Sequence, residues 1–270
     1  MSAHPAMQSA RRVFAMILRH FYLMRGSWPR ILDLIYWPTM QMVLWGFITL
    51  FLITNSSWVA QATGVLLSAV LLWDILFRGN ISLFLSFEEE VWSRNLGHLM
   101  VSPLRPGEFV VALIATSLVR TVIGVGGAAA LAAVMFDYSI LDLGLPLAGF
   151  FLNLIVLGWA LGLLVSGMVL RFGQGAESLA WAAVFLIQPV SGVYYPLAVL
   201  PDWLQPVARA LPSAHVFEGM RALVVDERFR ADLLFNASAL NLIYLAVGVA
   251  AFLGTMRIAR QRGLLLQIGE

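Results

Sequence analysis

Long apolar blocks, rather than alternating apolar and polar positions, dominate the chain. Each of six blocks is about as long as the roughly 20 residues that an α-helix needs to cross a bilayer. Continuous apolar runs argue against a transmembrane β-barrel, because apolar and polar residues alternate along the strands of such a barrel. The pattern therefore predicts an all-α, polytopic membrane protein. The six predicted spans cover residues 32–54, 63–86, 109–136, 144–170, 177–195 and 238–256.

The stretch before the first span, residues 1–31, has a different pattern, in which apolar and basic positions recur at helical spacing. A helix of this kind lies in the membrane interface, with its arginines toward lipid phosphates. We therefore expect an interface helix, which serves either as an anchor or as a functional contact. Its apolar and basic arcs include Phe14, Phe21, Arg11, Arg12 and Arg19.

Arginines indicate which ends of the spans face the cytoplasm. Five arginines precede the first span and three follow the last, whereas loops 55–62 and 137–143 hold no basic residue. Positively charged loops stay in the cytoplasm, so we expect both termini and the loop at 87–108 inside. Segment 196–237 departs from this rule, because it should lie outside but holds four arginines.

The loop at 87–108 is short and polar, and it begins with three consecutive glutamates. Its apolar residues recur at helical spacing and cannot form a core of their own, so they need a partner surface. We expect the second span to continue as a helix to about Met100 and to dock on that partner. Leucines would enter a groove, and charged residues would contact its rim. The expected contact residues are Glu88, Glu89, Glu90, Arg94, Leu96 and Leu99. The alternative is a solvated loop whose glutamates keep the end of the span in water.

The second polar region, 196–237, follows the fifth predicted span. Pro212 is expected to end one short helix that starts near Asp202, and Ser213 to cap a second one that runs to Ala222. Both helices are too short to cross a bilayer. They are expected to be interfacial or re-entrant at the outer face, because unpaired backbone groups cannot face lipid.

Three charged residues fall within predicted spans: Asp74, Arg78 and Arg120. A lone charge at mid-membrane costs about 2.5–3.5 kcal/mol on insertion scales. Asp74 and Arg78 are four residues apart and share a helix face, so we expect them to pair or to face protein or water. They either line a substrate path or gate, or form an ion pair that locks spans together. Gly158 and Gly162 form a G-x-x-x-G pattern that favours close helix packing.

Composition narrows the function. The chain is 60% hydrophobic, its mean hydropathy is +0.85, and all 17 basic residues are arginine. Without lysine it has no P-loop, so it is not itself a P-loop ATPase. Without cysteine it has no disulfide or thiolate metal site, and its isolated histidines predict no metal site. The dispersed net charge of +2 does not indicate nucleic-acid binding.

Two stretches carry a resemblance to a known family. Residues 191–223 contain "SG-x-x-x-P-x-x-x-LP-x-W-L…LP…E-G-x-R-A-L", and residues 87–106 contain "FEEE…SPLRP". These patterns resemble the permease subunits of type 2 ATP-binding cassette exporters, in the half-size group that includes drug-resistance and nodulation-factor exporters. The motif residues in the external loop are Gly192, Pro196, Pro201, Trp203, Pro212, Glu218 and Arg221.

The resemblance implies a homodimer in the bacterial cytoplasmic (inner) membrane, joined to separate ATPase subunits that hold ATP and Mg²⁺. It also implies that the loop at 87–108 is a coupling helix seated in a cleft of the ATPase. One departure is that many members carry Gly-Thr-x-Glu after the acidic residues, whereas this chain has "WSRNLGHL". That difference puts in doubt a transfer of individual contacts beyond Glu88 to Glu90.

The leading hypothesis is a single permease domain over 1–270, with the sixth span and a cytoplasmic tail at 238–270. It would export an amphipathic, lipid-linked, glycan or drug-like substrate without a cofactor of its own. A secondary transporter is an alternative, but it would be expected to have related halves, and no convincing repeat is present. An intramembrane enzyme is a second alternative. Its candidate residues Asp202, Ser213 and His215 are better explained by caps and turns.

Overall fold

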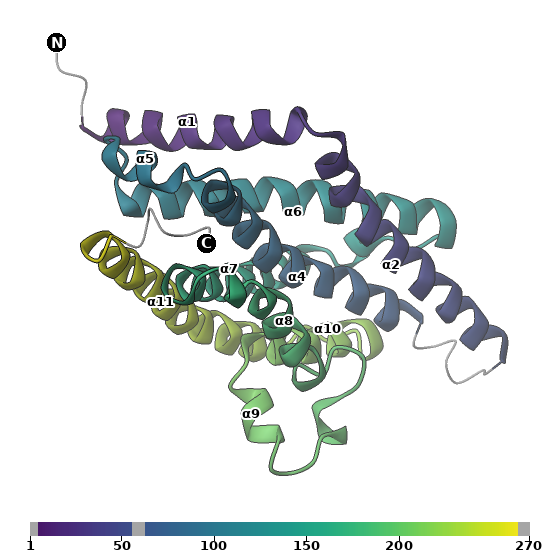
Figure 1. The fold of residues 1–270 in the computed structure, drawn as a ribbon. Helices are drawn as coiled ribbons and strands as arrows, with labels where there is room; N and C mark the ends of the chain where they lie inside the picture. The colour runs from purple at the N-terminus through teal and green to yellow at the C-terminus, as the bar shows by residue number, and fades with distance from the viewer. Residues whose placement is uncertain (1–4, 56–62, 264–270) are drawn as a thin grey trace.

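The structure, a computed structural model, describes residues 5–55 and 63–263, and this part of the chain is all-α (Figure 1). The predicted all-α class is confirmed. The α-helices are α1 (Pro5–Arg25), α2 (Trp28–Asn55), α4 (Thr63–Trp92), α5 (Leu96–Val101), α6 (Pro106–Phe136), α7 (Leu145–Phe172), α8 (Ser178–Val190), α9 (Gln205–Arg209), α10 (Pro212–Val225) and α11 (Ala231–Gln261). Short 3₁₀ turns are η1 (Ile140–Leu143), η2 (Gln174–Ala176) and η3 (Leu197–Val199).

Five helices of the described chain are long and apolar enough to cross a membrane: α2, α4, α6, α7 and α11. The fifth predicted span, 177–195, is different. Its helix α8 has 13 residues, or about 20 Å at 1.5 Å per residue, against a hydrocarbon core of about 30 Å. The predicted count of six full spans is therefore not confirmed.

The helix directions nevertheless require the chain to return between α7 and α11. Gly149 of α7 lies against Leu234 near the start of α11, and Gly167 lies against Thr255 near its end. The two helices are thus parallel. The chain must come back from the end of α7 to the start of α11, and α8 with the non-helical residues that follow it makes this passage.

Helix α4 lies at the centre of the bundle and packs on α2, α6 and α7. A β-carbon at Gly158 would lie 2.6 Å from the carbonyl oxygen of Leu76, and one at Gly162 would lie 2.9 Å from that of Asn80. The two backbones therefore touch, and the predicted packing role of this G-x-x-x-G pattern is confirmed. The Asn80 side-chain amide also donates to the Ala180 carbonyl at 2.9 Å, which attaches α8 to the same helix.

Two ends of the bundle are distinguished below. The α5 end holds α1, α5 and the last turns of α11; the α10 end holds α9 and α10 (Figure 1). Helix α1 lies alongside α6 and stops at Arg25, so the helix is shorter than the segment 1–31 predicted to lie in the membrane interface. Met16 and Met24 are buried in the core, whereas Phe14 is 63% and Phe21 48% exposed.

Candidate functional site

The three glutamates at the end of α4 form the most densely connected polar group at the α5 end. Successive residues on an α-helix point about 100° apart. Glu88, Glu89 and Glu90 therefore face three different neighbours, although they are adjacent in sequence. Glu88 and Glu90 are buried, at 1% and 0% exposure. The expectation that their carboxylates are exposed on a polar loop is wrong, because the surrounding helices enclose this last turn of α4.

Glu90 joins α4 to α1. Its two carboxylate oxygens accept hydrogen bonds from Nε and Nη2 of Arg19, at 2.8 and 3.1 Å. The Asn95 side chain donates to the same carboxylate at 2.6 Å and so holds the turn before α5. A two-pronged arginine–carboxylate contact is directional as well as strong. Arg19 therefore contacts protein rather than the lipid phosphates that the sequence suggested.

Glu89 joins α4 to α6 and α2. Arg120 of α6 donates to it through Nη2 at 3.2 Å, and the Nε of Arg30 in α2 lies 3.6 Å from the same oxygen. Glu88 faces the carboxyl group of Glu177, just before α8. Neither Glu88 oxygen has a hydrogen-bond donor among the described residues. The three glutamates thus reach α1, α2, α6 and the residue just before α8.

A fourth carboxylate, Glu108, secures the return of the loop into α6. Arg12 of α1 donates to both of its oxygens at 2.8 and 2.6 Å, and the backbone N–H of Arg105 donates at 2.9 Å. The hydrogen bond to Glu108 holds the pKa of the Arg12 guanidinium above its usual value. Sequence reasoning missed Glu108. The signal was present, since Pro106 at the first helical position and glutamate at the third mark a helix start. Arg11 remains exposed.

The loop itself is not one continuous helix. Helix α4 ends at Trp92, Arg94 takes a left-handed backbone conformation with φ of 53°, and α5 begins at Leu96. The predicted continuation to Met100 is therefore wrong, because a left-handed residue interrupts the helical hydrogen bonds. Leu96 is 2% exposed and packs inside the chain, and Leu99 is partly buried. The exposed side chains of this loop include Trp92, Arg94, His98 and Val101.

The charges within the spans do pair. Nε of Arg78 donates to Asp74 at 2.7 Å, and the two side chains are 8% and 12% exposed. A β-carbon at Gly124 of α6 would lie 2.9 Å from the guanidinium carbon of Arg78. Glycine at this position therefore leaves room for the arginine, a role that the sequence did not reveal. Arg120 pairs with Glu89 instead of joining this pair.

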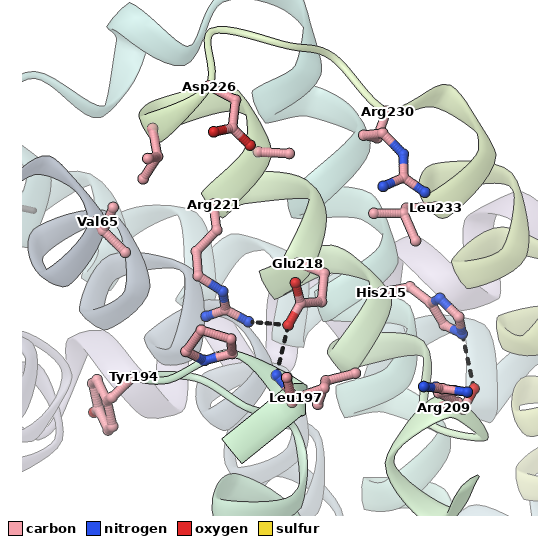
Figure 2. A pocket seen from close by; sticks show the side chains of 14 residues that line it. Val65, Tyr194, Leu197, Arg209, His215, Glu218, Arg221, Asp226, Arg230 and Leu233 are labelled. Carbon is pink, nitrogen blue, oxygen red and sulfur yellow. Dashed lines mark hydrogen bonds and ion pairs between the residues drawn. The ribbon is translucent and has the colours of Figure 1, made fainter. Parts of the chain in front are cut away.

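At the α10 end, two motif residues brace a turn. Figure 2 shows Glu218 of α10 accepting from the backbone N–H of Leu197 at 2.8 Å and from Nη2 of Arg221 at 2.9 Å. Nη1 of Arg221 donates to the carbonyl of Gly192 at 2.7 Å. Gly192 has a φ of +61°, which disfavours other residues. The motif thus holds the shape of the segment after α8.

The remaining motif residues lie around this brace. Pro212 begins α10 rather than ending a helix before it, and the hydroxyl of Ser213 bonds to Ser191 at 2.7 Å rather than capping. Proline fits there because the first helical residue needs no N–H donor. Pro196, Pro201 and Trp203 are exposed. A cavity of about 860 Å³ lies over α10, and its lining carries charges of both signs (Figure 2).

No group of three or more His, Cys, Asp or Glu side chains placed to hold a metal occurs in residues 5–55 and 63–263. A comparison with protein-family models matches residues 11–225 to the model described as ABC-2 type transporter. That range contains the row of glutamates, the loop around α5 and the brace in α10. A search of curated proteins finds no match.

Proposed function

Because the chain belongs to the ABC-2 type transporter family, we propose that it is the permease of an ATP-driven exporter for an amphipathic, lipid-linked, glycan or drug-like substrate. Family membership makes it the membrane subunit of a transporter, without an ATPase domain. The enzyme and secondary-transporter alternatives are set aside on this ground. ATP and Mg²⁺ are proposed to bind to a separate ATPase subunit.

The observation that carries the coupling proposal is the connectivity of the glutamate row. A partner that moves the loop around α5 also moves the end of α4, because Glu90 binds Asn95 of that loop and Arg19 of α1. Glu89 extends the connection to α6 through Arg120. In this proposal the glutamates transmit motion from within the chain. The exposed side of the loop, with Leu99 at its edge, is the surface that contacts the ATPase subunit in this proposal.

The docking surface can be tested by introducing negative charges into it. Trp92 is 58% and Val101 89% exposed, so replacing both with aspartate should leave the permease folded. The double variant should lose its ATPase on co-purification, since burying two new carboxylates against a partner is costly. Val225→Asp is the matched control, because Val225 is 60% exposed at the α10 end. Full retention of the ATPase by the double variant would refute this docking surface.

We also propose that the α5 end is cytoplasmic and that both termini lie inside. The parallel course of α7 and α11 supports this topology, because α8 and the residues after it then complete an even number of passages. Since the chain has no cysteine, single cysteines report topology without background. Arg94→Cys should label only from inside and Asp142→Cys from outside. External labelling at position 94 would contradict the orientation.

A second copy of the chain is the proposed partner within the membrane. The most apolar windows of α2 and α11 are each only 22% buried inside one chain, and we assign the contact to α2. The open face would contact another subunit or lipid. Cysteine pairs on α2, at Leu44 and Phe47, should crosslink between copies in native membranes. Crosslinking no greater than that of Phe235→Cys, an exposed position on α11, would indicate a lipid-facing α2.

A further inference from the structure

A cavity of about 380 Å³ opens between α2, α4, α6 and α8, beside the row of glutamates. Its lining has two chemically different parts. The polar part includes Arg30, Asp33, Arg78, Ser82, Glu89 and Arg120. The aromatic part includes Trp37, Phe77 and Trp181.

The guanidinium groups in this cavity hold more N–H donors than the described chain has acceptors for. Arg78 uses Nε for Asp74, and its Nη1 and Nη2 bond to no acceptor within residues 5–55 and 63–263. Arg120 uses Nη2 for Glu89, and its Nε is buried without a partner. The two arginine side chains are only 8% and 7% exposed. The unpaired Nε of Arg120 is fully buried and costs free energy, whereas the unpaired Nη groups of Arg78 are not fully buried and can reach a ligand, so the site suits an acceptor supplied from outside the chain.

The geometry of the donors indicates which acceptor. Guanidinium groups present planar N–H forks that match the oxygens of a phosphate. The aromatic part adds a second requirement, since Trp37 is 54% and Trp181 41% exposed on helices that would face lipid. A ligand that satisfies both parts has an oxyanion at one end and an apolar chain at the other.

We propose that this cavity binds the phosphate headgroup of a membrane amphiphile. Arg78 and Arg120 donate to the phosphate oxygens, and Arg30 closes the rim, where its side chain is 41% exposed. The apolar chain of the amphiphile lies along Trp37 and Trp181. A membrane phospholipid and an exported phosphate-bearing lipid share this chemistry.

Directed donors, rather than net charge, provide the selectivity. Asp33 and Glu89 line the cavity, and Asp74 pairs with Arg78 beside it, so these three carboxylates formally balance the three arginines and leave no net charge to attract every anion. Hydrogen bonds at a nearly buried site are also weakly screened by salt. Binding should therefore depend on the phosphate group and change little with ionic strength.

The inference rests on the proposed function only in placing the chain in a membrane. Binding is measured on the purified permease in detergent, without its ATPase. A failure to bind would refute the phosphate site and leave the export proposal intact. A failure of the ATPase to co-purify would count against the export proposal and leave the phosphate site intact.

The test measures tryptophan fluorescence of the permease during titration with three probes: phosphatidylglycerol, diacylglycerol with the same chains, and glycerol phosphate. Phosphatidylglycerol should bind saturably. Diacylglycerol should bind at least about tenfold more weakly because it lacks the phosphate, and one charged hydrogen bond contributes about that factor. Glycerol phosphate should also bind at least about tenfold more weakly, because it lacks the apolar chains that would lie along Trp37 and Trp181.

The paired variants Asp74→Asn/Arg78→Gln and Glu89→Gln/Arg120→Gln should each weaken phosphatidylglycerol binding about tenfold or more. Arg171→Gln, an exposed arginine outside the cavity, is the matched control and should bind normally.

Two variants keep the proposal testable if the paired ones do not fold. Gly124→Ala displaces the Arg78 guanidinium without removing a charge, and Arg30→Gln removes the rim guanidinium, which lies 3.6 Å from Glu89 and donates to the Leu23 carbonyl at 3.0 Å. Both should weaken phosphatidylglycerol binding and leave diacylglycerol binding unchanged. The proposal is overturned if diacylglycerol binds as tightly as phosphatidylglycerol, or if the folded variants match the Arg171→Gln control. It is equally overturned if glycerol phosphate binds as tightly as the lipid, since the site would then take small anions rather than an amphiphile.

Discussion

The α5 end and the α10 end both contain Glu–Arg contacts, but these contacts connect different things. At the α5 end, Arg12–Glu108 and Arg19–Glu90 join residues 96 and 71 positions apart in the chain. At the α10 end, Glu218 and Arg221 are three positions apart and act on the backbone of one nearby turn. The first arrangement ties separate helices into one unit. The second preserves the shape of a single segment.

Burial sharpens this difference. The Glu90 side chain is fully buried, whereas that of Glu218 is 30% exposed and can be hydrated if its partner is lost. An unpaired buried charge costs far more than an unpaired exposed one. Loss of an arginine should therefore disturb several helices at the α5 end and only one loop at the α10 end.

The largest effect is expected at the helix contact that both ends share. In Gly158→Ala the new β-carbon would lie 2.6 Å from the carbonyl oxygen of Leu76. Backbone cannot move aside as a side chain can, so we expect a loss of about 3 kcal/mol in the free energy of unfolding. Single cysteines introduced at His98 and Trp203 report on the two ends, and both should be labelled faster by a thiol reagent in the Gly158→Ala background. Gly126→Ala is the control, because a β-carbon there meets nothing within 4 Å. Loosening at one end alone would show that the ends are not joined through α4 and α7.

The next largest effect should follow Arg19→Met. This change leaves the buried carboxylate of Glu90 without its guanidinium, and we expect a loss of about 2 kcal/mol, measured by thermal unfolding in detergent. Adding Glu90→Gln should restore more than half of it, as a double-mutant cycle would reveal. Arg25→Met, at an exposed position in the last turn of the same helix, should have no effect. A full loss that Glu90→Gln does not reduce would mean that Arg19 stabilises α1 in another way.

A smaller and more local effect is expected for Arg221→Met. Gly192 would lose a hydrogen bond to its carbonyl, but the partly exposed Glu218 can take up water, so we expect about 1 kcal/mol. Limited proteolysis should show faster cleavage after α8 and no change at the loop around α5. Arg228→Met, a nearby exposed arginine, is the control. Faster cleavage at the α5 end would contradict the local role of this brace.

The smallest effect should be that of Arg230→Ala. The Arg230–Asp232 pair is short, at 2.6 Å, but its side chains are 45% and 56% exposed. Exposed pairs contribute little to stability, and salt screens them. The thermal unfolding curves of the variant and the parent should coincide in high salt. A clear difference between the two curves that persists in high salt would show that exposure is a poor guide to these energies.

The length and continuity of the apolar runs predicted the helical class and five of the long spans, because crossing a bilayer imposes a length that sequence displays directly. The G-x-x-x-G pattern predicted a close contact for the same reason, since only small residues allow backbones to touch. The pairing of Asp74 with Arg78 could also be anticipated, because both lie on one face of one helix. The fifth span was harder, since an apolar run does not show where its helix ends.

Tertiary structure alone decided what the charged loop does. Three adjacent glutamates read as a polar surface, yet their directions around α4 place each against a different element: α1 for Glu90, α6 and α2 for Glu89, and Glu177 for Glu88. The break at Arg94 and the burial of Leu96 likewise depend on how the loop folds back on α4 and α6. A sequence displays spacing along one element. The partners of these side chains come from helices far away in the chain, and only packing brings them together.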